Sequence, residues 1–256
     1  MSSLYRHVQN EQMKIYSRTR TWVMLGILVL AIVMMALMMK YAMDVSLNHA
    51  FPFLSLSTNL TWLVFIFSVI IAGDSVASEF TWGTIKLLLI RPVTRSKILA
   101  AKYISVFLFL LTLLLVLFIA SYFVGLLFFG LSGTVNEPDA FTNVLRAYGL
   151  KWVDLLMSVT LAFMISAAFR SSSLAIGLSI LLMFTANSVV FILVAFKYNW
   201  AKFLLFANTD LSPYFLGGNP PIAGMTLGFS VTVLIVYWII FYGVAWLLFT
   251  KRDIAG

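Results

Sequence analysis

Two long apolar runs of this chain are separated by Ser78-Glu79-Phe80-Thr81-Trp82-Gly83-Thr84-Ile85-Lys86-Leu87-Leu88-Leu89-Ile90-Arg91-Pro92-Val93-Thr94-Arg95. Apolar side chains and cations are interspersed along this stretch, a pattern typical of a segment that lies at a membrane surface. A segment in that position can receive a force from a soluble partner and pass it to the membrane spans on either side. We therefore treat residues 75–97 as a candidate coupling segment.

The composition requires a partly lipid environment. Hydrophobic residues make up 62% of the 256 residues, charged residues only 10%, and the mean hydropathy is +1.02. A soluble domain of this length could not bury so much apolar surface. The absence of cysteine excludes disulfide frameworks, thiolate catalysis and zinc–thiolate sites. We attribute the net charge of +8 to membrane orientation rather than to nucleic-acid binding.

Six stretches are long and apolar enough to cross a membrane, which requires about 20 residues for about 30 Å of hydrocarbon. They are residues 21–39, 55–73, 103–129, 152–169, 171–196 and 225–249. The predicted fold is therefore an all-α polytopic membrane protein, with residues 1–20 as a surface segment and residues 21–256 as a six-span domain. The first apolar run has 19 residues and no small-x-small site after it, so we interpret it as an uncleaved anchor rather than a signal peptide.

The positive charges predict the direction of insertion. Twelve of the 17 Lys and Arg residues lie in the segments on the side of the N-terminus, whereas acidic residues balance the five on the other side. Because cytoplasmic segments carry the excess of Lys and Arg, we expect both termini in the cytoplasm, in a bacterial cytoplasmic membrane.

Three further segments are predicted to lie at the surface. Residues 4–16 place Leu4, Val8 and Ile15 near one helical face, which favours a helix in the inner interface over a plain basic tail. Residues 136–148 predict a short helix on the outer surface. The apolar stretch 197–224 fits either a re-entrant hairpin or an ordinary surface loop, since its Pro and Gly residues break any long helix.

The local signals in the coupling segment predict a helix of about three turns, roughly 18 Å long. Ser78 can cap it, Glu79 suits its first turn, and Arg91-Pro92 would end it. Gly83 costs roughly 1 kcal/mol relative to alanine inside a helix, so we expect a close approach to the backbone at this position. An interfacial helix whose cations meet anionic lipid remains the alternative.

The motif Glu79-x-x-x-Gly83-Thr84-x-x-x-Leu88-x-x-Arg91-Pro92-x-x-Arg95, placed just after a second span, resembles the signature of type-2 ABC exporter permeases. Asn10-Glu11-x-x-Lys14-Ile15 ahead of the first span is similar to the approach helix of that family. The resemblance implies a permease that dimerises and pairs with two cytoplasmic ABC ATPase subunits. It also implies that the coupling residues are Glu79, Gly83, Thr84, Arg91, Pro92 and Arg95.

The same resemblance includes a subset that exports amphipathic peptides or gives immunity to antimicrobial peptides. The abundant apolar and aromatic residues of the spans favour a hydrophobic or amphipathic cargo, with a peptide as the first expectation and a lipid or drug as the next. A membrane-bound immunity protein that sequesters a toxin, and an ion-coupled secondary transporter, are the alternatives.

Several chemistries are not expected in this chain. It has no Gly-Lys dipeptide and hence no P-loop, so ATP and Mg²⁺ would be bound by the partner ATPase and the chain itself would not be an enzyme. His7 and His49 fall in separate surface segments, so no metal site is predicted. Asp74 and Asp154 fall at span ends, which argues against an ion-coupled carrier. Asp154 is either a residue of an outer gate or an interfacial anchor.

Small residues predict close helix packing at two places. Ser171, Ala175 and Ser179 recur every four residues along the fifth span, and Gly224-x-x-x-Gly228 precedes and opens the sixth. Such faces allow helices to approach closely, either within one bundle or at the seam of a homodimer.

Overall fold

The computed structural model describes residues 4–42, 49–84, 93–131, 139–169, 171–215 and 218–251. Within these ranges the chain is helical and contains no strand, which confirms the all-α fold. Six helices or helix pairs of this part of the chain are long and apolar enough to span a membrane. They are Thr19–Ala42, Ala50–Thr81, Arg95–Phe129, Ala140–Ala168, Ser172–Ala195 and Leu227–Lys251.

The individual elements follow in chain order. They are α1 (Leu4–Tyr16), α2 (Thr19–Leu37) with a π-helical extension (Met38–Ala42), α3 (Ala50–Leu56), a 3-10 turn (Ser57–Leu60), α4 (Thr61–Thr81), α6 (Arg95–Phe129), α7 (Ala140–Ala168), α8 (Ser172–Ala195), a 3-10 turn (Asn199–Phe203), α9 (Leu205–Asn208), α10 (Ser212–Phe215) and α11 (Leu227–Lys251).

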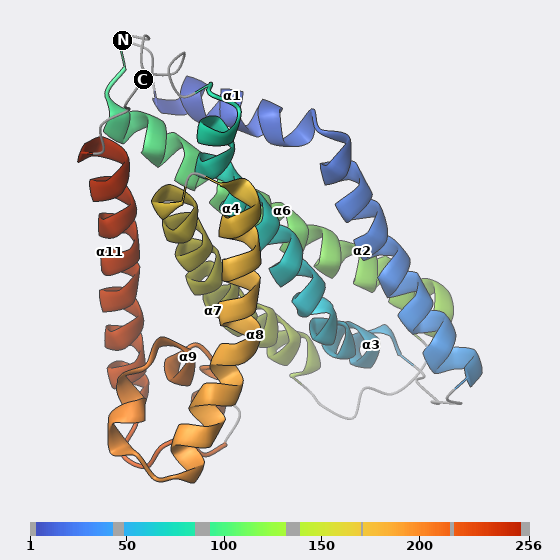
Figure 1. The fold of residues 1–256 in the computed structure, drawn as a ribbon. Coiled ribbons are helices and arrows are strands. Elements are labelled where there is room, and N and C mark those ends of the chain that lie inside the picture. Colours follow the sequence, from blue (N-terminus) through green and yellow to red (C-terminus); the bar gives the residue numbers. More distant parts are fainter. Residues whose placement is uncertain are drawn as a thin grey trace.

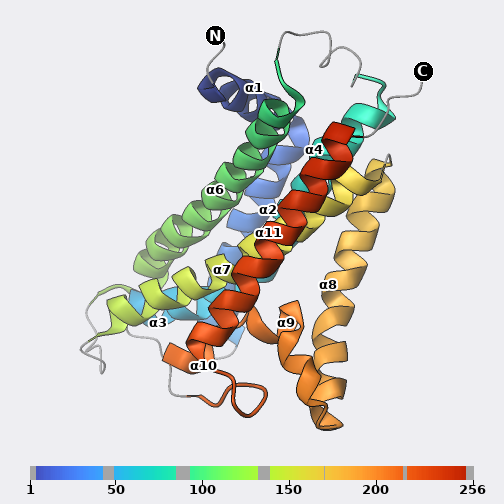
Figure 2. The same cartoon turned by 90° about the vertical axis from the view of Figure 1, so that its left-hand side faces the viewer.

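Helix α1 lies across one end of the bundle, at a steep angle to α2 (Figure 1). The last turns of α4 and α11 and the first turns of α6 reach the same end, which we call the α1 end. Helices α9 and α10 lie at the opposite end, which we call the α9 end (Figure 2). Helix α4 runs through the middle of the bundle and packs most extensively against α7 and α8.

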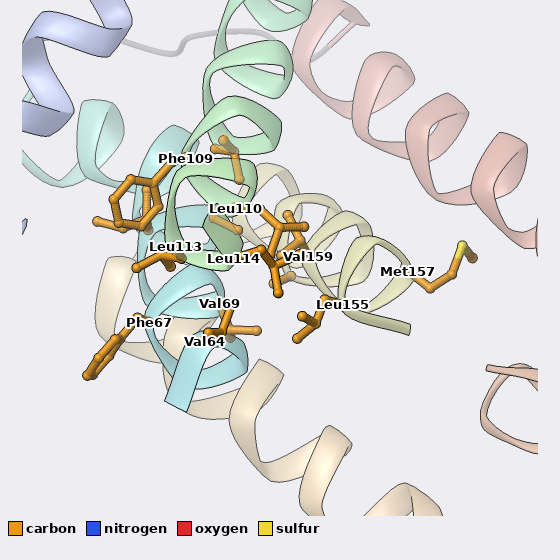
Figure 3. Packing of buried hydrophobic residues seen from close by; sticks show 14 of the residues in the cluster. Val64, Phe67, Val69, Phe109, Leu110, Leu113, Leu114, Leu155, Met157 and Val159 are labelled. Atoms are coloured by element: carbon orange, nitrogen blue, oxygen red, sulfur yellow. The ribbon is translucent and has the colours of Figure 1, made fainter. Parts of the chain in front are cut away.

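The core is formed by side chains that α4, α6 and α7 direct toward one another (Figure 3). Val64 and Val69 of α4 and Leu113 of α6 are fully buried. Because lipid is as apolar as these side chains, close packing rather than exclusion of water has to hold such helices together. The helices pack closely at Gly73 of α4, where an added Cβ would lie 3.0 Å from Cγ1 and 3.2 Å from Cα of Ile176 in α8.

Helix α4 extends further than the sequence predicts. The second span was expected to end at residue 73, with a new helix capped by Ser78, but α4 continues without interruption to Thr81. Ser78 therefore lies in the last turns of α4, and the prediction that it begins a helix is wrong. The physical reason is that residues 74–81 contain no helix breaker, and that the polar groups among them have partners on other helices.

Two other boundaries also differ. Helix α6 begins at Arg95 rather than at residue 103, so it includes the lysines that hydropathy would place outside the span. Helix α7 runs from Ala140 to Ala168 without a break, although a short outer helix and a separate span from residue 152 were expected. No proline interrupts residues 140–168, and the single Gly149 costs too little to end the helix.

The stretch 197–224 folds back toward the bundle at the α9 end. Helix α9 packs against α8 and α11 (Figure 2). The side-chain amide of Asn208 holds this bend by donating to the carbonyl oxygens of Lys202 and Leu204, both at 2.8 Å. Ala201, Leu205 and Ala207 of the same segment are buried.

Candidate functional site

The candidate site lies at the α1 end, where α1 is attached to α6. The amphipathic pattern of residues 4–16 forms α1 as predicted, with a face that packs on the bundle. Gln12 donates its amide to the carbonyl oxygen of Ser105 at 2.8 Å, and the Tyr16 hydroxyl donates to Thr112 Oγ1 at 2.8 Å. Both contacts join α1 to α6, so α1 is part of the folded bundle rather than a tail.

Lys102 is at the centre of the site. Its side chain is only 2% exposed, and its Nζ lies 2.9 Å from Glu11 of α1 and 2.9 Å from Glu79 of α4. The same ammonium group donates to the carbonyl oxygen of Ser75 at 3.0 Å. A buried ammonium group is tolerated only when it is paired and hydrogen-bonded, and here three partners meet that requirement. Lys102 thus joins α1, α4 and α6 at one point.

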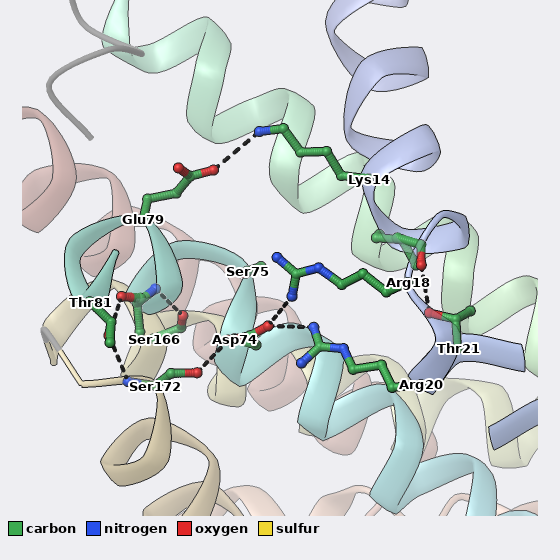
Figure 4. A network of polar contacts seen from close by, with 12 residues as sticks. Lys14, Arg18, Arg20, Thr21, Asp74, Ser75, Glu79, Thr81, Ser166 and Ser172 are labelled. Carbon is green, nitrogen blue, oxygen red and sulfur yellow. Dashed lines mark hydrogen bonds and ion pairs between the residues drawn. The ribbon is translucent and has the colours of Figure 1, made fainter. Parts of the chain in front are cut away.

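Lys14 adds a second cation to the same two carboxylates. Its Nζ lies 2.7 Å from Glu11. The same atom lies 3.2 Å from Glu79 (Figure 4). Burial opposes the charged form of Glu11, but Lys102 and Lys14 outweigh it, so the pKa of Glu11 lies below its usual value. Burial likewise opposes the charged form of Lys14, but Glu11 and Glu79 raise its pKa above the usual value. Glu11 is therefore ionised and Lys14 protonated at neutral pH.

A second ionic cluster lies beside the first and attaches the start of α2 (Figure 4). Asp74 of α4 accepts from Arg18 at 2.6 Å and also from Arg20. The hydroxyl of Ser172, at the start of α8, donates to the other oxygen of the same carboxylate. Asp74 therefore holds the turn between α1 and α2 against α4 and α8.

Helix α7 contributes a polar contact to the same region of α4. The Ser166 hydroxyl oxygen accepts from the backbone N–H groups of Val76 and Ala77, at 3.1 and 3.0 Å. Thr81 Oγ1 accepts from the backbone N–H of Ser172 at 3.4 Å. The last two turns of α4 are consequently bound to α1, α6, α7 and α8 at once.

The structure brings together part of the predicted coupling set. Thr84 donates its hydroxyl to Glu79, so these two residues meet where α4 ends. Gly83 lies between them with a φ of +67°, and among the described residues an added Cβ would have no neighbour within 4 Å. Within this part of the chain, no group makes the close approach expected at Gly83. Glycine is favoured there because the backbone is left-handed, which ends the helix.

Arg95, the other coupling residue that the structure describes, contacts the end of α11. Arg95 Nη1 donates to the carbonyl oxygen of Thr250 at 3.0 Å, which ties the start of α6 to the end of α11. Arg91 and Pro92 lie outside the described residues, as does the predicted coupling helix between residues 85 and 92.

The site is filled by paired charged side chains and leaves little room for a ligand. The cavity lined by Glu11, Lys14, Asp74, Glu79 and Lys102 has a volume of only about 40 Å³. That volume is close to the share of a single water in the liquid, about 30 Å³. Among the described residues no group of three or more His, Cys, Asp or Glu side chains could hold a metal ion.

Sequence reasoning missed Lys102 and the partners of Asp74. Lys102 was taken as a charge outside the third span, because hydropathy gives no sign of carboxylates on distant helices. The sequence did show charged residues of both signs beside the predicted inner ends of the spans, namely Glu11, Lys14 and Glu79. Charges of opposite sign at the same membrane face could have suggested ion pairs between the helices. Asp74 was expected at the end of its span, but it lies seven residues before the end of α4, and its two arginines could not be assigned from the sequence.

The small-residue motifs have different outcomes. Ala175 and Ser179 are fully buried, so these two pack within one bundle. Ser171 is the N-cap of α8 and accepts from the backbone N–H of Leu174 at 3.5 Å. Gly224 precedes α11 and has a φ of +83°, so Gly224 and Gly228 do not share a helix face and that prediction is wrong.

Asp154 lies within α7 rather than near its start, fourteen residues after Ala140. Its side chain is partly buried. His49, expected to be an exposed histidine, is buried instead and caps α3 by accepting from the backbone N–H of Phe51 at 3.2 Å.

Comparison with known proteins shows the family. Residues 28–255 match the model of the family described as "Protein of unknown function (DUF2705)". The chain belongs to the DUF2705 family. It is 39% identical to "Uncharacterized protein YhcI" of Bacillus subtilis (strain 168), over 97% of this chain and 99% of that protein. It is 35% identical to "Uncharacterized membrane protein YdbK" of the same strain, over 94% of this chain and 99% of that protein. The described helices and this relative support a multi-pass membrane protein.

Proposed function

We propose that this chain is the permease subunit of an ATP-driven exporter of the type-2 ABC class. The observation that carries the proposal is the position of Glu79. This residue lies at the end of α4, directly before the surface segment that carries the motif, and it is bound to Lys102 of α6 and Lys14 of α1. The proposal places the α1 end in the cytoplasm of a bacterial cell, with both termini.

The contacts at Glu79 give the surface segment a route to three helices. Thr84 begins that segment and donates to Glu79, and Glu79 shares Lys102 with Glu11. Ionic groups buried in this way have few alternative partners, so a displacement of the segment has to move the helices or break the pairs. A soluble ATPase that pushed on residues 82–94 would thereby move α1 and α6 together with α4.

The proposed assembly is a homodimer of this chain with two copies of a cytoplasmic ABC ATPase, which would bind ATP and Mg²⁺. Closure of the ATPases around ATP would shift the two bundles between inward-open and outward-open states. The cargo would be hydrophobic or amphipathic, with an amphipathic peptide first and a lipid or drug next. Immunity to an antimicrobial peptide would then follow from its export.

Purification of the chain from a producing cell tests this proposal. We expect an ABC ATPase to copurify and the complex to hydrolyse ATP, and we expect Glu79→Ala with Gly83→Leu to reduce the retained ATPase about tenfold, a loss of about 1.4 kcal/mol in binding. Asp139→Asn, a change at the α9 end, is the matched control and should have no effect. An isolated chain that protects cells from a toxin without any ATPase would be a sequestering immunity protein, and the exporter proposal would fail.

A further inference from the structure

A second cavity lies away from the charged junction. It is lined by residues of α4, α7 and α8, and α9 contributes Phe206 to its wall. Its volume is about 310 Å³. Trp62, Phe65 and Phe184 supply further aromatic surface. Its volume falls at the lower end of the range of sites that bind small ligands, roughly 300–1,000 Å³. The junction cavity is several times smaller.

The charges around this cavity are arranged unequally. Asp154 and Lys151 both line it and lie about one turn apart on α7. Asp154 is partly buried, whereas Lys151 is exposed. Asp210 is exposed and lies outside the lining of the cavity. Asp154 is therefore the one carboxylate among the lining residues, and it is the less exposed of the two charged groups there.

From this arrangement we propose that the cavity binds the amine-bearing part of an amphipathic peptide, with a lysine ammonium group at Asp154 and an adjacent apolar side chain against the aromatic wall. A wholly apolar ligand would leave the Asp154 carboxylate shielded from water without a new partner. An anion would meet the like charge of Asp154. Aromatic rings attract cations as well as apolar groups, so Trp62 and Phe184 suit both parts of such a ligand.

The size of the cavity favours a peptide over a phospholipid as the source of the amine. A cavity of about 310 Å³ holds one or two side chains, whereas the two acyl chains of a phospholipid would have to lie outside it. The fold-back of residues 199–215 matters here, because it supplies Phe206 to the wall of the cavity. This inference rests on the proposed function and deepens it, because it assigns a binding site to the proposed cargo.

The test uses the full chain in phosphatidylcholine nanodiscs and the fluorescent probe dansylcadaverine, which carries an alkylammonium group on an aromatic body. Its N-acetylated form is the matched neutral probe, and empty nanodiscs give the background. We expect saturable binding of the charged probe and at least about tenfold weaker binding of the neutral one. Equal affinity for the two probes would overturn the proposal.

Variants assign the binding to this cavity. Asp154→Asn keeps the shape and removes the charge, so it should weaken the charged probe about tenfold and leave the neutral probe unchanged. Asp210→Asn, at an exposed carboxylate outside the cavity lining, should change the affinity by less than about threefold. Equal losses for both probes in Asp154→Asn would indicate a general loss of structure, and they would overturn the assignment of Asp154.

Competition identifies the source of the amine. The tripeptide amide Phe-Lys-Phe should displace the probe, and the same peptide with acetyllysine should not. Displacement by phosphatidylethanolamine in the nanodisc, but not by the peptide, would overturn the peptide assignment. The Asp154→Asn variant should still retain the ATPase, because the proposed ATPase contact lies at the α1 end and the cavity lies toward the α9 end. Loss of probe binding with the ATPase retained would therefore concern the cavity alone, and not the exporter assembly.

Discussion

Lys102 of α6 and Glu79 of α4 form an ion pair at 2.9 Å, although the lysine side chain is only 2% exposed. Glu11 of α1 lies at the same distance from the same ammonium group. A lysine in this environment depends on both carboxylates, and each carboxylate depends on it.

Replacement of Lys102 by methionine should therefore be strongly destabilising. The change keeps most of the side-chain volume but leaves Glu11 and Glu79 without their shared cation, and such losses cost about 3–5 kcal/mol. We expect the apparent Tm of the purified protein to fall by about 10 °C. Lys97→Met, at an exposed position of the same helix, is the control and should shift the Tm by no more than about 2 °C. Similar Tm values for the two variants would contradict the buried junction.

Removal of the charge at Asp74 should loosen the turn between α1 and α2. Asp74→Asn weakens the contacts to Arg18 and Arg20, so both arginines become better substrates for trypsin. We expect cleavage at these two residues to speed up by about tenfold, which corresponds to about 1.4 kcal/mol of local opening. Digestion of the protein in detergent, followed by mass spectrometry, measures the rate. An unchanged rate in Asp74→Asn would show that Asp74 does not restrain the turn.

Glycine substitutions should separate two kinds of position. Gly83→Ala places a side chain at a φ of +67°, which costs about 1–2 kcal/mol. Gly177→Ala lies inside α8 with no atom within 4 Å of the new Cβ, so it should be neutral or stabilise the protein by up to about 1 kcal/mol. Thermal unfolding of the two variants gives the comparison. A stabilising Gly83→Ala would mean that this residue is not left-handed in the membrane.

Acid should release α1. The pKa of Glu11 lies below its usual value of 4.5, so the ionised form is favoured in the folded state. The stabilisation by Glu11 is therefore complete above pH 4.5 and is lost as the pH falls through the lower, folded-state pKa. Since the chain has no cysteine, Met13→Cys on α1 can carry a single spin label.

The spin label should remain ordered from pH 7 to pH 4.5 and become mobile only at lower pH. Glu11→Gln in the same labelled protein should give a label that is already more mobile at pH 7. A wild-type label that becomes mobile near pH 6 would contradict the lowered pKa of Glu11.

Single cysteines can measure the proposed orientation. Thr94 precedes α6 at the α1 end, and Thr142 lies on the first turn of α7 at the other end, and both are exposed. An impermeant thiol reagent added to intact cells should label Thr142→Cys, whereas Thr94→Cys should react only after the cells are opened. The reverse pattern would place the α1 end outside and would remove the basis for a cytoplasmic ATPase.

The fold was largely predictable because membrane spans are determined by local hydropathy. The apolar runs of residues 103–129 and 225–249 reappear in α6 and α11, with shifted ends. The ends shifted where charges are neutralised by distant residues, as at Lys102. Gly224 and Gly228 were misjudged because a small-residue pattern does not show whether the backbone is helical.

The candidate site was predicted only in part. Glu79 and Thr84 could be chosen from the motif, and the amphipathic pattern of α1 could be identified from the sequence. Their connection could not, because Gln12 and Ser105 lie 93 residues apart and Glu11 and Lys102 lie 91 apart. Local patterns contain no information on such pairs, which depend on how the helices cross.

The attachment of α1 also sets an order for biogenesis. Helix α1 is synthesised before its partners on α6, because Lys102, Ser105 and Thr112 follow about ninety residues later. Until the third span has been inserted, Glu11 lacks Lys102, and α1 lacks its contacts with Ser105 and Thr112. Helix α1 therefore cannot dock on α6 until the third span is in place. Its docked state requires that the spans before α7 have been inserted correctly.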